Sequence, residues 1–519
     1  MRKLSRITPL AVAAVMASAM VAAVTGSTVA ASAEQAGGRG GGSMSTVNLR
    51  DVASMADVQP TKPAGAEHKR LNRPVLPSQP TTGRRPALPA GGGAAVNGTP
   101  TSTFAVMQNF EGIAEGASCF CEPSDVNAAA SPTEIAEIVN TFLQVTDKDG
   151  NILCNGGVAL NRFLRTTDAL SDPRIQYDNL ADRFTMSVTV IPPSSSATPA
   201  LWVVASDTGD VCGSWRSARL TFQGGSFPAG TLIDYPMLGQ DTDAVLLSTA
   251  NVRPNGSVDF SVFGLPKSKL YIGAHVDFVV SLTDALAAPV SNAGTPMIST
   301  FPFSYFVTAA PGVGYVLYRM RNAGTLSESL TKQATISSPF TAPTRRINQP
   351  RTTTTLDPLD GRIQWSPVTD GFSIWFAHDV ALAGFPTVRY GAINIASNTV
   401  TAAFAYHSFT SDDFNPSIGI GLAPAGGTFV FLNWAYTDTA NGVGTSDVVD
   451  WVLPFDGVPN LIGTGQVHFI GTSTEQTRFG DYSSVVSDPS VPGGSCAVIA
   501  QQYFDLALWH TRVARVGSC

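Results

Sequence analysis

Short runs of apolar and β-branched residues, separated by polar turns, dominate the chain from Thr103 onward. Helical spacing is nearly absent, because the one candidate, residues 133–145, also fits a strand. This pattern predicts an all-β fold of the sandwich, barrel or propeller type. The clearest runs are Phe184 to Ile191, Leu201 to Ser206, Ala244 to Val252 and Phe429 to Tyr436, and turn signals stand at Asp149-Gly150-Asn151, Asn255-Gly256 and Asp456-Gly457.

A small repeated motif favours the propeller. It consists of a polar residue or turn, usually a proline, and then an apolar residue that opens a strand. Its copies lie 50 to 66 residues apart, and one blade of four short strands needs about 40 to 50 residues before loop insertions. We therefore predict a β-propeller with seven blades of four-stranded antiparallel sheet. The copies are Glu122-Pro123, Asp172-Pro173, Tyr235-Pro236, Thr295-Pro296, Asp360-Gly361, Asn415-Pro416 and Asp481-Tyr482.

The N-terminal residues predict export. Arg2, Lys3 and Arg6 precede a short apolar run from Leu10 to Ala23, and Ala31-Ser32-Ala33 offers a cleavage site. These are the three parts of a secretory signal, so residues 1–33 are assigned to a signal peptide. No later segment is apolar for long enough to span a bilayer. We expect a secreted, extracellular protein without stable membrane insertion.

Residues 34–103 differ from the rest of the chain in composition. They are rich in Gly, Pro, Ser and Ala and contain few aromatic residues. Such a stretch buries too little apolar surface to offset its ordering entropy, so we predict a disordered linker. Residues 104–519 then form the propeller domain.

Charge narrows the class of partner. The chain has a formal net charge of −7, and without the basic signal and linker the domain stands near −14. An acidic domain argues against nucleic acid, whose binding requires positive charge facing the phosphates. The preference for Arg over Lys fits the codon usage of a GC-rich bacterial genome. For the oligomeric state, we expect a monomer.

All six cysteines follow the predicted cleavage site, and an even number in an exported chain suggests disulfides. The residues are Cys119, Cys121, Cys154, Cys212, Cys496 and Cys519. Six cysteines allow 15 pairings. We favour Cys496 with Cys519, and Cys119 or Cys121 with Cys154, because both pairs close local loops.

Several stretches resemble a group of secreted bacterial β-propeller proteins that are loosely described as sialidase-like. The similarity spans about residues 104–519 and departs from the usual pattern at Ser131 and Phe479. It implies the propeller fold and no particular activity. The matching stretches include Pro123 to Ala128, Ser171 to Asp178, Asp234 to Gly239, Trp375 to His378 and Phe479 to Ser484.

A sialidase-type hydrolase would need arginines around a substrate carboxylate, a tyrosine nucleophile and an acidic residue. The chain lacks the complete Asp-box turns of such enzymes, the nearest stretch being Ser206 to Asp210. The candidate catalytic residues for this chemistry are Asp172, Arg174, Tyr235, Arg362 and Tyr482, with Arg478 as a further arginine.

The aspartates near the motif allow two interpretations. Asp125, Asp172, Asp234 and Asp481 can cap free backbone N–H groups. Alternatively, several carboxylates at one end of the channel would need a cation, which predicts a Ca²⁺ site made by the same four residues. These aspartates and His378 are the candidate binding residues, although a lone histidine is usually packed.

Three classes of function stay open at this point. We favour a binding module for a glycan, a cell-surface polymer or a protein. The alternative is a carbohydrate-active hydrolase with its site at the mouth of the propeller channel. The third is a structural or adhesive surface protein.

Overall fold

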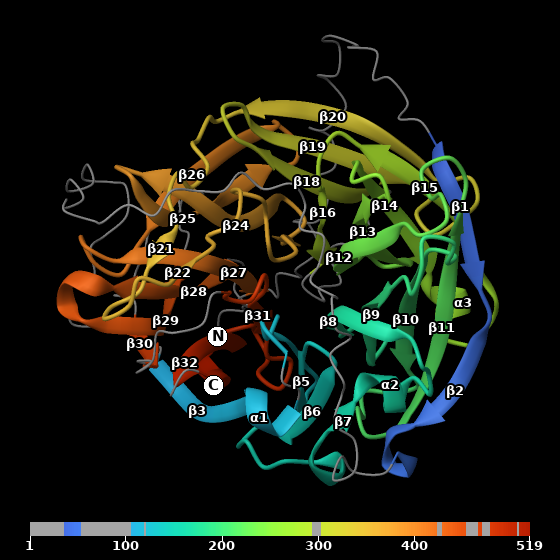
Figure 1. Ribbon diagram of the computed structural model, residues 1–519, viewed down its shortest axis with the longest axis horizontal. Coiled ribbons are helices and arrows are strands. Elements are labelled where there is room, and N and C mark those ends of the chain that lie inside the picture. Colours follow the sequence, from blue (N-terminus) through green and yellow to red (C-terminus); the bar gives the residue numbers. More distant parts are fainter. Residues whose placement is uncertain are drawn as a thin grey trace, which may run out of the picture. The chain divides into compact units, whose positions relative to one another are not determined.

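Antiparallel sheets of mostly four strands stand around one axis in the unit formed by Ala33–Cys519 (Figure 1). The computed structural model describes residues 36–52, 105–118, 121–292, 303–422, 428–452, 466–469, 478–505 and 508–519. The predicted signal peptide and most of the predicted linker lie outside these residues. The described part is an all-β propeller, as the strand pattern and the repeat predict.

Each sheet is a meander of consecutive strands. The first three groups are β4 (Asn127–Ala130), β5 (Glu134–Val139), β6 (Phe142–Asp147) and β7 (Val158–Ala159); β8 (Ala169–Asp178), β9 (Arg183–Ile191), β10 (Ala200–Ser206) and β11 (Ser214–Gln223); and β12 (Leu232–Gln240), β13 (Ala244–Val252), β14 (Val258–Pro266) and β15 (Val276–Thr283).

Three further meanders follow. They are β16 (Ala288–Pro289), β18 (Ser304–Ala310), β19 (Gly314–Arg321) and β20 (Ser329–Ser337); β23 (Val368–Thr369), β24 (Ser373–Leu382), β25 (Phe385–Asn394) and β26 (Thr399–Ala405), with β17 (Ser291–Asn292) added parallel to β23; and β27 (Asp412–Leu422), β28 (Thr428–Asp438), β29 (Val443–Val452) and β30 (Gln466–Phe469).

The last sheet joins the two ends of the domain. It contains β31 (Ser484–Ser487), β32 (Cys496–Asp505) and β33 (Leu508–Gly517), and its outer strand is β3 (Ala105–Ala114). The remaining elements are short: the hairpin β21 (Ile347–Asn348) and β22 (Thr355–Leu356), helices α1 (Glu115–Ser118), α2 (Leu160–Phe163) and α3 (Lys267–Leu270), and 3-10 turns at Leu49–Asp51, Cys154–Gly156 and Thr439–Asn441.

The innermost strands close a ring around the axis. Starting at β4, each innermost strand contacts the next one around the ring: β4 contacts β8, and β8 contacts β12. β12 contacts both β16 and β17, and β17 pairs with β23. β23 then contacts β27, β27 contacts β31, and β31 contacts β4 again. Seven four-stranded groups can be traced in the described residues. Since segments such as 293–302 lie outside them, the blade count of seven stays a prediction.

The core lies between neighbouring sheets, which explains why many strands are buried on both faces. One apolar cluster joins Met237 and Ala250 of one sheet to Leu317 and Phe376 of the next two. Another contains both Trp375 of β24 and Trp434 of β28. Each sheet thus hides its apolar faces only by standing beside its neighbours.

The repeated motif opens or interrupts the innermost strands. Three copies fall inside a strand at a β-bulge, where Asp172, Tyr235 and Asn415 have φ near +50° and the next residue is a proline. Proline has no N–H for the ladder, so a bulge is the place where a strand tolerates it. Asp125 and Gly361, in two other copies, also have positive φ. The copy at Thr295 lies outside the described residues.

Part of the predicted linker is ordered, which corrects that expectation for residues 36–48. Strand β1 (Ala36–Gly42) pairs with both β11 and β15 and so joins two neighbouring sheets at their outer edges (Figure 1). Strand β2 (Met44–Asn48) continues along β11. The glycines are required by crowding, because a Cβ at Gly40 would lie 2.2 Å from the ring of Phe278 and 2.5 Å from the Thr221 carbonyl oxygen.

Of the predicted disulfides, one is confirmed and one is wrong. Cys496 is bonded to Cys519. Cys154 is bonded to Cys212 rather than to Cys119 or Cys121. This bridge links the loop after β6 to the loop before β11, so it joins adjacent sheets instead of closing a local loop. Cys121 is also disulfide-bonded, and Cys119 lies outside the described residues.

Candidate functional site

The predicted catalytic residues converge at the ends of the innermost strands where the motif lies. The rings of Tyr235 and Tyr482 meet edge to face with centroids 4.8 Å apart. The Tyr482 hydroxyl donates to Asp172 Oδ2 at 3.2 Å, and the Tyr235 hydroxyl donates to the Asp481 carbonyl oxygen at 3.2 Å. The Arg362 guanidinium lies over the Tyr235 ring at 5.0 Å. One cluster therefore contains residues that are far apart in sequence.

Asp125 belongs to the same cluster. Its Oδ1 accepts a hydrogen bond from the Asp481 N–H at 2.7 Å, and its Oδ2 accepts one from Asn140 Nδ2. Burial raises the pKa of Asp125 to about 7, and the carboxylates of Asp481 and Asp172 add to the shift while Arg478 opposes it. Asp125 therefore tends to keep its proton where an exposed aspartate would not.

The three predicted arginines have different environments. Arg362 pairs with Asp360, and Arg478 lies 3.8 Å from Asp481. Arg174 is 1% exposed, and its Nε and Nη1 make no hydrogen bond. Its guanidinium instead packs over the rings of Tyr482 at 4.3 Å and Trp365 at 5.1 Å. The three arginines thus do not act as one unpaired set.

A pocket of about 270 Å³ lies on the axis beyond Arg174. Its wall combines aromatic rings with side-chain amides from the innermost strands and the segments that follow them. It runs from the buried Arg174 to Asn179 and Pro492, which are exposed. The lining residues include Asn127, Gln176, Tyr177, Gln240, Asn292 and Trp365. Of the cluster described above, Arg174 is the residue that also lines this pocket.

The repeat could have located this lining. Asn127, Gln176, Gln240 and Trp365 each lie four or five residues after the first residue of a motif copy. The motif copies open or interrupt the innermost strands, so the residues just past each copy lie beside the channel. The sequence interpretation stopped at the motif and missed them.

None of the five predicted binding residues lines the pocket. Asp125, Asp172 and Asp481 belong to the cluster, and the other two lie elsewhere. Asp234 is buried on β12 beside Tyr235. His378 is 0% exposed, and its ring nitrogens contact the Tyr315 hydroxyl and the Gly361 carbonyl oxygen, each at 2.9 Å. Burial lowers the pKa of His378 to about 3, so its ring is neutral. Its packing gives a binding role no support.

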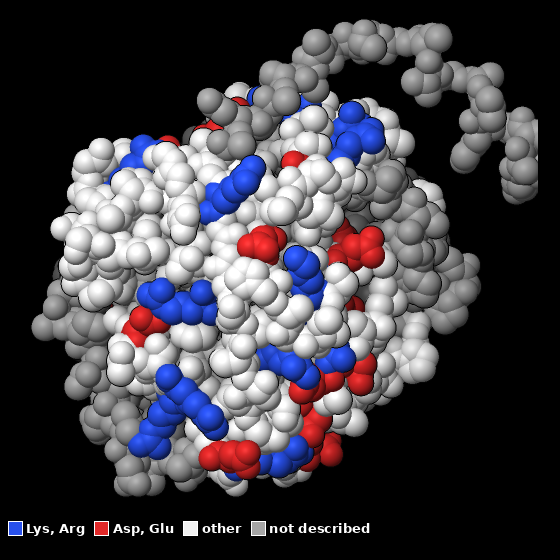
Figure 2. Space-filling model, turned by 90° about the vertical axis from the view of Figure 1, so that its right-hand side faces the viewer, with Lys and Arg blue, Asp and Glu red and all other residues white. Residues whose placement is uncertain are grey.

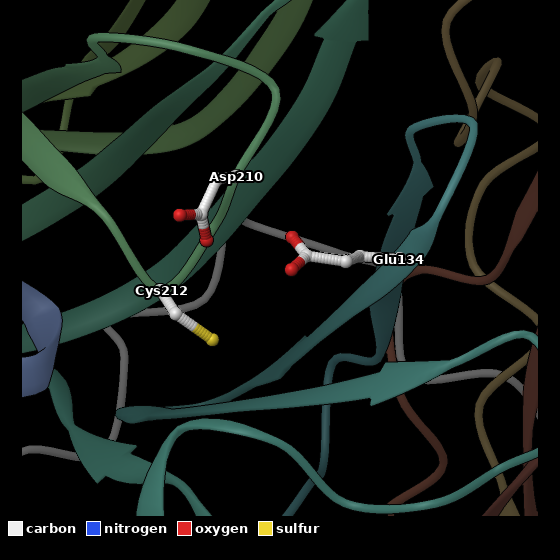
Figure 3. A group of neighbouring side chains, drawn as sticks. All are labelled: Glu134, Asp210 and Cys212. Atoms are coloured by element: carbon white, nitrogen blue, oxygen red, sulfur yellow. The ribbon is translucent and has the colours of Figure 1, made fainter.

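The calcium prediction gains no support from the cluster geometry. Among the described residues, Glu134, Asp210 and Cys212 form a group of possible metal ligands (Figure 3). Their ligand atoms lie within 4.8 Å of one another. Cys212 is bonded to Cys154, Glu134 accepts from the Val211 N–H at 2.7 Å, and Asp210 pairs with Arg50. These contacts account for the group without an ion. A Ca²⁺ site at the four aspartates stays a prediction.

Charges of both signs are mixed on the face that carries β1, β2 and β11 (Figure 2). Arg216 pairs there with Asp207, and Arg219 with Asp168. Among the described residues of this face, positive and negative side chains therefore alternate. In the described part of the chain, no helix is long and apolar enough to cross a membrane.

Comparisons with known proteins add distant likenesses only. No family model and no curated protein match the sequence. Among solved structures, the chain is similar to an α-L-arabinanase from Penicillium chrysogenum complexed with arabinobiose (TM-score 0.37, 10% identity, 80% of this chain and 99% of that one). It is similar also to a mutant Trypanosoma rangeli sialidase with trans-sialidase activity (0.32, 10%, 72% and 57%) and to Drosophila Plexin A (0.31, 8%, 80% and 88%). At these TM-scores the likenesses decide nothing about function, which has to come from the site itself.

Proposed function

We propose that this protein is carbohydrate-active and holds a glycan in the axial pocket. The observation that carries the proposal is the composition of the pocket wall, in which the aromatic rings of Tyr177 and Trp365 stand among the amides of Asn127, Gln176 and Gln240. Rings pack against the C–H faces of a sugar, while amides both donate to and accept from its hydroxyls. A concave site with a few converging polar groups is the usual form of a small-ligand site.

Export fits this proposal. The disulfides Cys154–Cys212 and Cys496–Cys519 are of the kind that persists in oxidising compartments. We propose that the protein meets its glycan outside the cell.

Thermal unfolding with a panel of oligosaccharides tests the binding. A sugar at a hundred times its dissociation constant stabilises the protein by about 2.7 kcal/mol, which raises the melting temperature visibly. Gln176→Ala should weaken the binding of the active sugar roughly fivefold, the effect of one lost hydrogen bond. Gln333→Ala is the matched control, because Gln333 also donates its amide to a carbonyl oxygen but lies on the outer strand β20. If no sugar raises the melting temperature, the proposal fails.

Hydrolysis is a second candidate, because the neighbouring cluster holds Asp125, with a raised pKa, beside Asp172 and Asp481. These carboxyls do not line the pocket, so cleavage would require the sugar to extend past Arg174 into the cluster. Glycosidases need one protonated carboxylic acid and one ionised carboxylate, and the surroundings of the two groups give them different pKa values. Release of reducing ends from the bound sugar should then fall at least about a hundredfold in Asp125→Asn, as expected on loss of general acid catalysis. A sugar that binds and is never cleaved would contradict hydrolysis and indicate that the protein is a binding module.

A further inference from the structure

The axial pocket carries a surplus of buried hydrogen-bond donors. Arg174 Nε and Nη1, Asn127 Nδ2, Asn292 Nδ2 and Trp365 Nε1 are all buried and make no hydrogen bond. A buried donor without an acceptor is costly, and a buried guanidinium without hydrogen bonds is more so. These atoms belong to different strands and line one pocket, so a single ligand can satisfy several of them.

The donor character of this set is fixed by chemistry and by neighbouring contacts. Arginine and the tryptophan indole can only donate. Asn127 Oδ1 already accepts from the Ile175 N–H at 2.7 Å, which leaves its Nδ2 as the free group. Gln240 is the exception, since its Nε2 donates to the Tyr177 carbonyl oxygen and its Oε1 is left as an acceptor.

The charge of the pocket points the same way. Its charged lining residues are Arg174 and Asp488. Asp488 is compensated by Lys148 at 3.0 Å and Arg515 at 2.8 Å. Arg174 has no ion pair among the described residues, and Asp172, the acid nearest in sequence, accepts from Ser171 and Tyr482 instead. The carboxylates of Asp172 and Asp125 lie near enough to act on the Arg174 charge, but neither forms an ion pair with it. A positive charge whose Nε and Nη1 donors have no acceptor therefore stands at the inner end of the pocket.

We propose that the glycan held in the axial pocket is acidic, and that Arg174, Asn127 and Trp365 bind its oxyanion, a carboxylate or a sulfate ester. This inference rests on the proposed function. An oxyanion offers several acceptor lone pairs to the guanidinium, the indole and the amide at once. Gln240 Oε1 is left for a hydroxyl of the same sugar. Stacking between two rings holds the Arg174 guanidinium in place before the ligand arrives.

Calorimetric titration of the whole mature protein tests the inference. The probes are a uronic-acid disaccharide, a sulfated disaccharide and a neutral disaccharide, each beside sodium sulfate alone. The acidic sugars should bind roughly 10- to 150-fold more tightly than the neutral one, the range that charge-assisted hydrogen bonds supply. Which acidic sugar binds more tightly separates carboxylate from sulfate.

Two pocket variants and one control variant keep the test independent of folding. Arg174→Met should remove the preference for the acidic sugar, while Arg216→Gln, on the outer strand β11, should keep it. Trp365→Phe keeps one aromatic ring and removes the pyrrole ring with its N–H donor, so it should weaken binding of the acidic sugar roughly fivefold more than binding of the neutral sugar.

The outcomes separate the two proposals. Equal binding of acidic and neutral sugars would overturn the oxyanion assignment and keep the glycan site. Binding of sulfate alone, lost in Arg174→Met, with no sugar bound, would keep the oxyanion site and overturn the proposed function. Binding of none of the four probes would overturn both.

Discussion

Buried ionisable side chains in this protein follow two regimes. Burial would raise the pKa of Asp488, but the ammonium of Lys148 and the hydrogen bonds from Ser490 together outweigh it and the pKa is lowered. Glu137 has no such cation among the described residues and accepts a hydrogen bond from the Thr511 hydroxyl. Its burial raises its pKa to about 7. The presence of a paired cation thus decides which carboxyls keep a proton at neutral pH.

Glu137 should make the protein less stable as pH rises. The folded state holds a proton that the unfolded state releases above its ordinary pKa of 4.5, so the stabilisation present below pH 4.5 is lost as pH rises to about 7. The loss is on the order of 3 kcal/mol in the free energy of unfolding. Glu137→Gln should show a flatter decline in melting temperature between pH 4.5 and 8, and higher stability than the wild type above pH 7.

Asp284→Asn, at an exposed carboxylate, is the control for this experiment. It should follow the wild-type pH profile. Equal pH slopes for Glu137→Gln and the wild type would show that the Glu137 carboxyl is ionised in the folded protein.

The sequence located the cluster around Asp172, Tyr235 and Tyr482, because a repeat brings equivalent positions of each blade to one end of the ring. It could not predict which arginine is left without an acid. Arg362 and Arg478 each pair with an aspartate two or three residues away. Arg174 also follows an aspartate, but the bulge at Asp172, with φ of 49°, lets that carboxylate bond Ser171 and Tyr482 instead.

At the scale of elements, β1 shows a limit of pattern-based prediction. A strand is predicted from alternating apolar side chains, and AGGRGGG has none of them. The apolar surface comes from the partners, where Phe278 packs with Phe222 and Phe263. A glycine-rich sequence predicts a linker, whereas the slot between β11 and β15 is too crowded for a Cβ at the glycine positions of β1.

Gly40→Ala should disturb this strand. The Thr221 carbonyl oxygen belongs to the backbone and cannot move away from a new Cβ as a side chain can. We expect a loss of about 1–3 kcal/mol in the free energy of unfolding, the usual cost of overpacking, together with faster amide exchange in β1. Gly225→Ala is the control, since a Cβ there meets nothing within 4 Å. Equal stability of both variants would show that β1 is not held between its two partners.

At the scale of the molecule, the disulfides Cys154–Cys212 and Cys496–Cys519 close loops of different length. The Cys154–Cys212 bridge closes a loop of 58 residues and the Cys496–Cys519 bridge one of 23. A longer loop loses more entropy when it is closed in the unfolded chain, which gives about 4 and about 3 kcal/mol. Replacing Cys154 and Cys212 by alanine should therefore lower the free energy of unfolding in urea more than replacing Cys496 and Cys519. The reverse order would indicate that native packing dominates.

Because β3 pairs with β33, it cannot complete its sheet until the C-terminal strands have been synthesised. Glu111 of β3 and His510 of β33 contact each other across 399 residues of sequence. At about 5–20 residues per second, the ribosome delivers β33 roughly 20–80 s after β3. During that time β3 has no partner strand, and an unpaired edge invites association with other chains. A factor that shields nascent β3 should therefore raise the yield of active protein more than one that acts after release.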